Sequence, residues 1–338
     1  MILRPVLCCA LVWVVSTAGA VAADPASPTT LKTVDRIAIP DGPWDFTSVD
    51  VPARRLYLAR GDGVMSLDLD TGKVTPKLVP GARVHGVLPL AGGTGRILST
   101  NGETNTATIA EAATGKVVAE IPTGQNPDAV IQDAKTGLVL VMNAKNGDVT
   151  LIDPATTKAV GSIQIGGALE FGEAVDGIAY VNIEDKAELA IVDIAARKVT
   201  GRIALKGCEE PSGLARDPAS GVLLTVCANG VALAIDPAKS AVIATVPIGK
   251  HPDAAIFDAG RHQFLVPCGG DGTLTLISSD GHTVAAAGSV TTERGARTGA
   301  LDTKTGRIYL PTAEFGPPAT PGGRPTPVPG SFHLVVVG

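Results

Sequence analysis

A unit of about forty residues recurs along this chain from residue 45 almost to its end. Its first landmark is an acidic residue at the end of an apolar run, directly before a turn. The acids are Asp50, Asp133, Asp176, Asp217, Asp258 and Asp302, and in the second unit Leu90 occupies this position instead of an acid. Successive landmarks are 40, 43, 43, 41, 41 and 44 residues apart. A repeat of this length is typical of a β-propeller, in which each unit forms one blade.

A second landmark keeps the same period. The pattern apolar-acid-x-x-Thr-Gly-Lys-Val occupies residues 67–74 and 110–117 and returns around Asp153, Asp193 and Asp236. Between the landmarks, short runs rich in Val, Ile and Leu alternate with Gly, Asn, Asp and Pro turns, and no helical periodicity extends beyond two turns. We therefore predict an all-β, seven-bladed propeller whose inner strands begin near Trp44, Val84, Pro127, Leu169, Pro211, Pro252 and Ala296.

The last unit lacks an outer strand, because the chain ends after the strand at residues 332–337. The missing strand is available at the other end of the propeller, in residues 34–39, which precede the first inner strand. We predict that this N-terminal strand closes the last blade. Such closure pairs an otherwise open sheet edge and ties the two ends of the chain together.

The first residues predict a secretory signal peptide. Arg4 gives a short basic head, an apolar run follows through Val15, and Ala20-Val21-Ala22 forms an Ala-x-Ala cleavage site. We therefore divide the chain into a signal peptide (1–22), a disordered lead-in (23–30) and the propeller (31–338). The apolar run is too short to span a bilayer, so a periplasmic or secreted protein without a membrane span is expected.

The pattern of strand and turn residues at Arg307-Ile308-Tyr309-Leu310 and at residues 149–153 resembles that of the YVTN-type, YncE-like β-propeller proteins of bacterial periplasms. The resemblance covers roughly residues 31–338. It implies a seven-bladed propeller that serves as a binding scaffold, and it carries over no catalytic residue. The literal Tyr-Val-Thr-Asn string does not occur here; the nearest match is Tyr180-Val181-Asn182.

Charge and aromatic content exclude some ligand classes. Removing Arg4 from the 28 basic residues leaves 27 against 33 acidic ones, a net charge near −6 in the exported chain. This surface gives no electrostatic footprint for nucleic acid. Aromatic residues make up only 3% of the chain, too few for platforms on which bases or sugars stack. The expected partner is a protein or a small polar ligand, and the protein itself is expected to be a monomer.

Counting five residues back from each turn landmark predicts which side chains meet at the propeller axis. The count gives Asp45, His85, Asp128, Phe171, Ser212, Asp253 and Arg297, and an extra residue in the fourth unit puts Glu170 in place of Phe171. We take Asp45, His85, Asp128, Glu170, Asp253 and Arg297 as the ligand-binding residues of the channel mouth. Clustered carboxylates repel one another unless a cation or a proton compensates them. The alternative interpretation is a hydrated mouth whose acids cap strand ends.

Three cysteines remain after export. Cys227 and Cys268 fall at equivalent rim positions of neighbouring blades, and Cys208 lies in the loop that enters the fifth blade. An oxidising compartment favours a Cys208–Cys227 disulfide that leaves Cys268 free. The alternative is a copper or zinc site formed by Cys208, Cys227, Cys268 and His251, although the spacing matches no zinc signature.

A Pro-rich loop, residues 311–331, interrupts the last blade and should favour extended polyproline conformation. It leaves a second strand, so it is expected on the same face as the mouth, with Phe315 as its inward anchor. We predict an exported, non-enzymatic binding module that presents the mouth and this arm to its partner. No cofactor is predicted beyond a possible divalent cation. The alternative is a lactonase-like, metal-dependent hydrolase with a divalent cation at the axis, held by Asp45, Asp128, Glu170 and Asp253.

Overall fold

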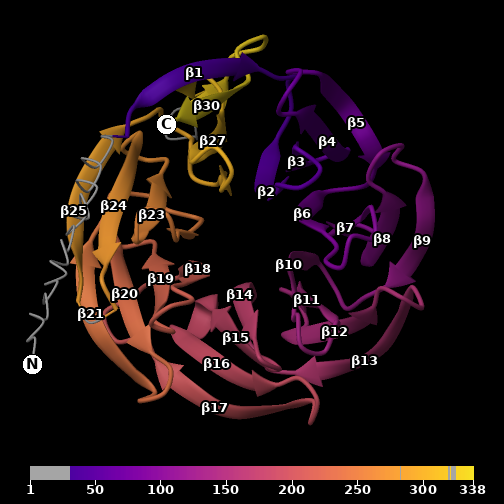
Figure 1. Ribbon diagram of the computed structural model, residues 1–338, viewed down its shortest axis with the longest axis vertical. Coiled ribbons are helices and arrows are strands. Elements are labelled where there is room, and N and C mark those ends of the chain that lie inside the picture. The colour runs from indigo at the N-terminus through magenta and orange to yellow at the C-terminus, as the bar shows by residue number, and fades with distance from the viewer. Residues whose placement is uncertain (1–30, 282, 319, 321–324) are drawn as a thin grey trace, which may run out of the picture. The chain divides into compact units, whose positions relative to one another are not determined.

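A computed structural model describes residues 31–338 apart from residues 282, 319 and 321–324. The predicted signal peptide and lead-in, residues 1–30, lie outside the described residues. The described chain forms seven four-stranded antiparallel sheets arranged around a central axis, as predicted (Figure 1). The only helical element among the described residues is a short 3-10 turn, η1 (Glu184–Lys186). In the described part of the chain, no helical segment has the length and apolarity that a membrane crossing needs.

The first four blades follow the chain without a crossover. Their strands are β2 (Trp44–Asp50), β3 (Arg55–Arg60), β4 (Gly63–Asp68) and β5 (Val74–Pro80); β6 (Val84–Pro89), β7 (Arg96–Asn101), β8 (Thr106–Glu111) and β9 (Val117–Pro122); β10 (Pro127–Gln132), β11 (Val139–Asn143), β12 (Asp148–Asp153) and β13 (Lys158–Gln164); and β14 (Leu169–Val175), β15 (Ile178–Ile183), β16 (Glu188–Asp193) and β17 (Lys198–Ala204).

The last three blades complete the circle. Their strands are β18 (Pro211–Arg216), β19 (Leu223–Cys227), β20 (Val231–Asp236) and β21 (Ala241–Pro247); β22 (Ile256–Asp258), β23 (Gln263–Cys268), β24 (Thr273–Ser279) and β25 (Val284–Thr291); and β26 (Ala300–Asp302), β27 (Arg307–Thr312), β30 (His333–Val337) and β1 (Thr33–Ala38). The first strand of each blade faces the axis and contacts the first strand of the next blade, and the fourth strand lies at the rim (Figure 1).

The N-terminal strand closes the last blade, as predicted. β1 pairs antiparallel with β30, with Ile37 opposite Leu334. The closure is reinforced beside the sheet, where Glu293 bonds both Arg36 of β1, at 2.7 Å, and His333 of β30, at 2.9 Å. Both chain ends of the propeller are therefore held in one sheet.

The acidic landmarks are turn residues, as their spacing predicted. Asp133 shows the pattern: one carboxylate oxygen accepts the backbone N–H and the hydroxyl of Thr136, and the other accepts the N–H of Gly177 in the next blade. Asp217 and Asp302 make the same local turn and reach the neighbouring blade through Ser279 and Arg54, respectively. Each acid therefore stabilises its own turn and the contact between two blades.

The Pro-rich loop is more ordered than an extended polyproline segment. It forms a two-stranded sheet of β28 (Phe315–Pro318) and β29 (Pro325–Pro327), with Phe315 opposite Pro327. Proline is tolerated here because both strands of such a pair are edges, and neither strand needs a donor on its outer side. The base of the loop is fixed where Asp41 accepts the N–H of Gly330 at 2.8 Å.

Candidate functional site: the mouth of the propeller

The predicted mouth residues occupy one structurally equivalent position. In five blades, the first residue of the inner strand pairs with the end of the second strand, and the register then shifts, as between Pro127 and Val130 of β10. Blade 6 has a lone bridge at the same place, between Pro252 and Cys268. The residue that follows this first pair lies in a β-bulge, which changes the direction of its side chain from that in a regular strand. The residues at this position are Asp45, His85, Asp128, Glu170, Ser212, Asp253 and, by equivalence, Arg297.

Contacts between blades fix the backbone of this ring. The hydroxyl of Thr100 in blade 2 donates to the carbonyl of Asp128 in blade 3 at 2.7 Å. Thr298 in blade 7 donates to the carbonyl of Asp45 in blade 1 at 2.9 Å. Asn182 in blade 4 donates to the carbonyl of Ser212 in blade 5 at 2.7 Å. At these three places, one blade holds the mouth residue of its neighbour.

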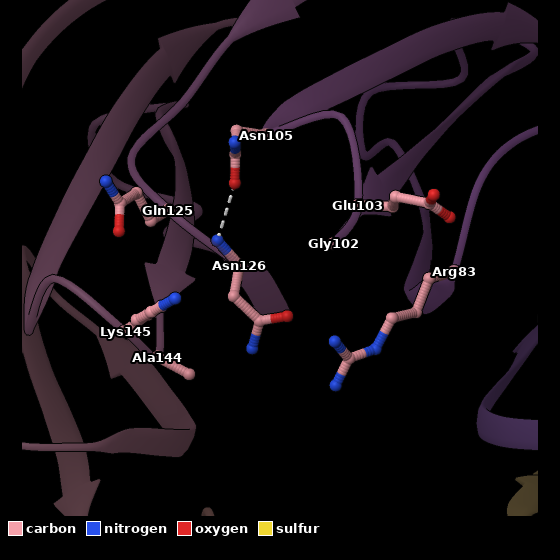
Figure 2. A pocket seen from close by; sticks show the side chains of 8 residues that line it. All are labelled: Arg83, Gly102, Glu103, Asn105, Gln125, Asn126, Ala144 and Lys145. Atoms are coloured by element: carbon pink, nitrogen blue, oxygen red, sulfur yellow. Dashed lines mark hydrogen bonds between the residues drawn. The ribbon is translucent and has the colours of Figure 1, made fainter.

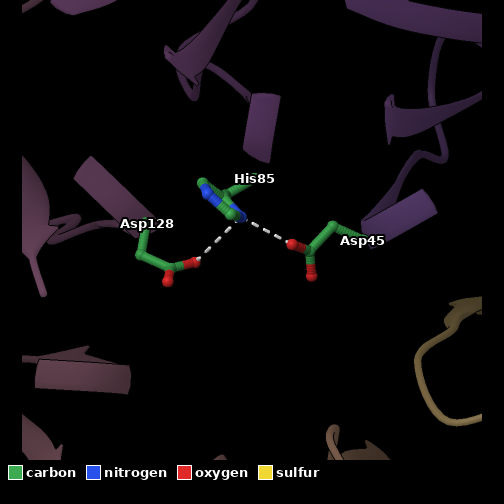
Figure 3. A group of neighbouring side chains, drawn as sticks. All are labelled: Asp45, His85 and Asp128. Atoms are coloured by element: carbon green, nitrogen blue, oxygen red, sulfur yellow. Dashed lines mark hydrogen bonds and ion pairs between the residues drawn. The ribbon is translucent and has the colours of Figure 1, made fainter. Parts of the chain in front are cut away.

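His85 lies between two carboxylates (Figure 3). Its Nδ1 is 2.7 Å from Oδ2 of Asp45 and 3.8 Å from Oδ1 of Asp128. The other ring nitrogen, Nε2, is buried and has no hydrogen-bond partner in the described chain. Burial disfavours the charged imidazolium, but the hydrogen bond to Asp45 and the charge of Asp128 raise the pKa of His85 above its ordinary value.

The residue at position 102 must be small for His85 to lie there. A Cβ on Gly102 would come within 2.8 Å of both Cδ2 and Nε2 of His85. Such a contact is closer than packed side chains allow, so any larger residue would displace the imidazole from the mouth.

The remaining carboxyl groups of the ring are also largely buried, and they lie close enough for the charge of one to shift the pKa of another. Burial raises the pKa of Asp128 to about 7, with Asp45 and Asp253 adding to the shift against the attraction of His85. Burial, followed by the charges of Asp128 and Asp253, raises the pKa of Glu170 to about 9. Burial raises the pKa of Asp253 to about 6, although its ion pair with Nε of Arg297, at 2.9 Å, opposes the shift. The mouth therefore holds more carboxyl groups than His85 and Arg297 can pair with, and near neutral pH the others keep some of their protons.

Phe171 does not belong to the ring. It follows Glu170, and its side chain meets that of Phe46 from blade 1, with ring centroids 5.1 Å apart. The equivalent position in other blades carries small residues such as Gly86, Ala129 and Gly213. Because blades 1 and 4 face each other across the axis (Figure 1), this aromatic pair fills the centre beneath the carboxylates. The mouth is therefore a well with an apolar floor, which the sequence count did not predict.

A groove adjoins the ring at blades 6 and 7. It has a volume of about 920 Å³, and Arg294, Arg297, His251 and the Pro-rich arm line it. Phe315 of the arm lies over Gly295, where an added Cβ would come within 2.5 Å of the phenyl ring, and packs against Trp44 at 6.4 Å between ring centroids. The expected inward anchor is therefore present, and 36% of Phe315 remains exposed to the groove side and solvent.

A second, open hollow of about 580 Å³ lies between blades 2 and 3. Figure 2 shows Arg83 and Lys145 extending into it from opposite sides, with Asn126 between them. Asn126 is held by a hydrogen bond from its backbone N–H to Oδ1 of Asn105, at 2.8 Å. Cations thus flank the acidic ring on this side as well.

The cysteines form the predicted disulfide. Cys208 and Cys227 are bonded, and Cys268 is free and buried. Cys227 pairs with Pro211, the residue before the ring position of blade 5, so the disulfide lies on the mouth face. Because the bond consumes two sulfurs, the alternative metal site with Cys268 and His251 loses two of its four donors.

The donors that do come together are different ones. The ligand atoms of Asp45, His85 and Asp128 all lie within 4.8 Å of one another. A carboxylate–imidazole trio of this kind suits zinc or another first-row divalent ion. The sequence placed all three in the mouth, but the hydrolase alternative assigned the cation to Asp45, Asp128, Glu170 and Asp253 and left out His85.

Comparison with known proteins supports the fold and goes no further. No protein-family model and no curated protein sequence matches the chain. A chain of the structure titled "Crystal Structure of Mitotic Checkpoint Complex" is similar, with a TM-score of 0.72 and 11% identity over 97% of this chain and 98% of that one. A chain of Kuenenia stuttgartiensis hydrazine synthase has a TM-score of 0.64 and 16% identity over 85% of this chain and 96% of that one. The YncE-like resemblance therefore stays a prediction.

Proposed function

We propose that the protein is an exported, non-enzymatic binding module whose working surface is the mouth ring together with the Pro-rich arm. The ring recognises a positively charged group on a protein or a small polar ligand. The observation that carries this proposal is the convergence of Asp45, Asp128, Glu170 and Asp253, whose mutual repulsion and burial leave carboxylates that a bound cation would stabilise.

The fold and the disulfide support the wider setting. Propellers offer rigid loop faces on which binding residues are displayed. The Cys208–Cys227 disulfide suits an oxidising compartment, in agreement with the predicted signal peptide.

Proton release tests this proposal. At neutral pH, Glu170 and part of Asp128 hold protons, and a bound cation should expel them because it favours the ionised carboxylates. We expect calorimetric titration of the mature protein with the diamine putrescine at pH 7 to show an apparent enthalpy that depends on the ionisation enthalpy of the buffer. Binding should weaken in Asp45→Asn and persist in Asp50→Asn, which alters a turn acid. Buffer-independent binding, or binding that survives Asp45→Asn, would contradict the proposal.

A metal-dependent hydrolase is the second candidate, because Asp45, His85 and Asp128 approach the geometry of a divalent-ion site. A bound ion would lower the pKa of a coordinated water and so supply a nucleophile. Melting the protein with Zn²⁺, Ca²⁺ or chelator distinguishes the candidates, since an ion that binds the folded state raises the melting temperature. The hydrolase is rejected if no ion raises it, or if His85→Ala leaves the effect unchanged.

A further inference from the structure

The groove beside the ring presents two arginines, whereas most residues of the ring are acidic. Its two arginines, Arg294 and Arg297, face a cavity of about 920 Å³. The guanidinium of Arg294 is exposed and forms no ion pair or side-chain hydrogen bond with any described residue. Among the groove's acids, Glu293 is already bonded to Arg36 and His333, and Glu314 is exposed at the base of the arm. The groove therefore offers cationic donors to an incoming group.

Arg297 joins the groove to the ring. Its Nε forms the ion pair with Asp253 at 2.9 Å, and its side chain remains 47% exposed. A guanidinium has five N–H donors in a planar fork. With Nε directed at Asp253, the terminal amino groups remain for a carboxylate in the groove, which guanidinium groups bind bidentately. One side chain thus separates a site for positive charge from a site for negative charge.

One wall of the groove is apolar. Phe315 lies over Gly295 and packs against Trp44, the residue that precedes Asp45 of the ring. Pro317 and Pro325 continue the same wall along the arm. Sites of a few hundred to about 1,000 Å³ that combine apolar walls with a few polar anchors are typical of small-ligand pockets.

From this arrangement we infer that the ligand is a zwitterion of the size of a short peptide, with its ammonium group in the acidic ring, its carboxylate at Arg294 and Arg297, and an apolar side chain against Phe315. This inference rests on the proposed function, because it assigns the ammonium group to the ring. It adds the carboxylate site, the apolar contact and the chemical class of the ligand.

Three matched probes test the inference: the dipeptide Ala-Phe, its C-terminal amide and its N-acetyl derivative. Trp44 is the reporter, because the other tryptophan, Trp13, lies in the predicted signal peptide and Trp44 contacts the groove wall. We expect mature protein to bind Ala-Phe about tenfold or more tightly than the amide, as a lost charge-assisted bidentate contact requires. Arg294→Gln should reduce this preference, with Arg297 still in place, without weakening the amide.

Arg83→Gln is the matched control, since Arg83 is also an exposed arginine on the mouth face but lines the hollow at blades 2 and 3. It should leave the preference intact. The inference is overturned if the amide binds as tightly as Ala-Phe, or if Arg83→Gln and Arg294→Gln act alike, which would indicate unspecific attraction. If instead the N-acetyl derivative binds as tightly as Ala-Phe, the ring does not take the ammonium group and the proposed function fails. Absence of binding by all three probes refutes both.

Discussion

Removing one charge from the mouth should stabilise the protein, and only at high pH. The pKa of Asp128 is raised from 3.8 to about 7 by burial, and its side chain is 15% exposed. A rise of about three units, at about 1.4 kcal/mol each, means that ionised Asp128 costs the folded state up to about 4 kcal/mol. Because the folded state keeps this proton longer than the unfolded chain does, the cost is absent below about pH 4 and complete above about pH 7.

We therefore expect Asp128→Asn to match the wild type in urea near pH 4 and to be more stable near pH 8, by about 1 to 4 kcal/mol. Unfolding can be followed by the fluorescence of Trp44 in the mature chain. Part of the gain should come from Glu170, because the charge of Asp128 contributes to its raised pKa.

Asp133→Asn is the matched control with the opposite sign. Burial alone would raise the pKa of Asp133, but hydrogen bonds from Thr136 and Gly177 outweigh it and lower the pKa. Its ionised form therefore stabilises the fold, so the Asn variant should be less stable than the wild type by a constant amount above about pH 4, and this difference should shrink as the pH falls through the lowered pKa. If Asp128→Asn is less stable than the wild type near pH 8, or if its effect does not change with pH, our account of the mouth is wrong.

Further predictions concern the disulfide, the arm and the closure. Reducing the Cys208–Cys227 bond, which joins residues 19 positions apart, should cost about 3 kcal/mol in urea unfolding; thiol titration of the denatured mature chain should find Cys268 alone without reductant and all three cysteines with it. Gly295→Ala should destabilise the folded protein by more than Gly92→Ala, for which roughly 1 kcal/mol is expected. Both glycines have positive φ, but only at Gly295 would an added Cβ come within 2.5 Å of Phe315. Equal melting temperatures of the two variants would contradict the packing described. A chain that begins at Asp41 lacks β1 and exposes the edge of β30, so light scattering should detect aggregation that the mature chain does not show.

The repeat made the architecture and the ring predictable from sequence. Turn acids such as Asp133 recur because each blade needs the same turn. Counting back from them reaches Asp45 and Asp128, and counting back from Leu90, which stands where the acid is missing, reaches His85. Five inner strands begin at the predicted residues. In blades 6 and 7 the paired strands begin later, at Ile256 and Ala300; between these blades the backbone N–H of Ala254 donates to the carbonyl of Arg297.

Features that depend on contact between blades were not predictable. The pairing of His85 with Asp45, rather than an even ring of acids, follows from the bulge geometry and from the space left by Gly102. The hairpin in the arm arises from local pairing that a proline count alone argues against. Which side chain of one blade contacts which side chain of another depends on the tertiary structure. The period of a repeat gives no information about such contacts.

The contact between Phe46 and Phe171 restricts traffic through the centre of the disc. The aromatic pair spans the axis between blades 1 and 4 and so narrows the route between the carboxylates and the opposite face of the disc. We therefore expect a proton expelled from Glu170 and an incoming ligand to use the same side of the disc, so that uptake of one and loss of the other are kinetically linked. Replacing Phe171 by alanine should remove this contact, widen the route and weaken the link between the two events.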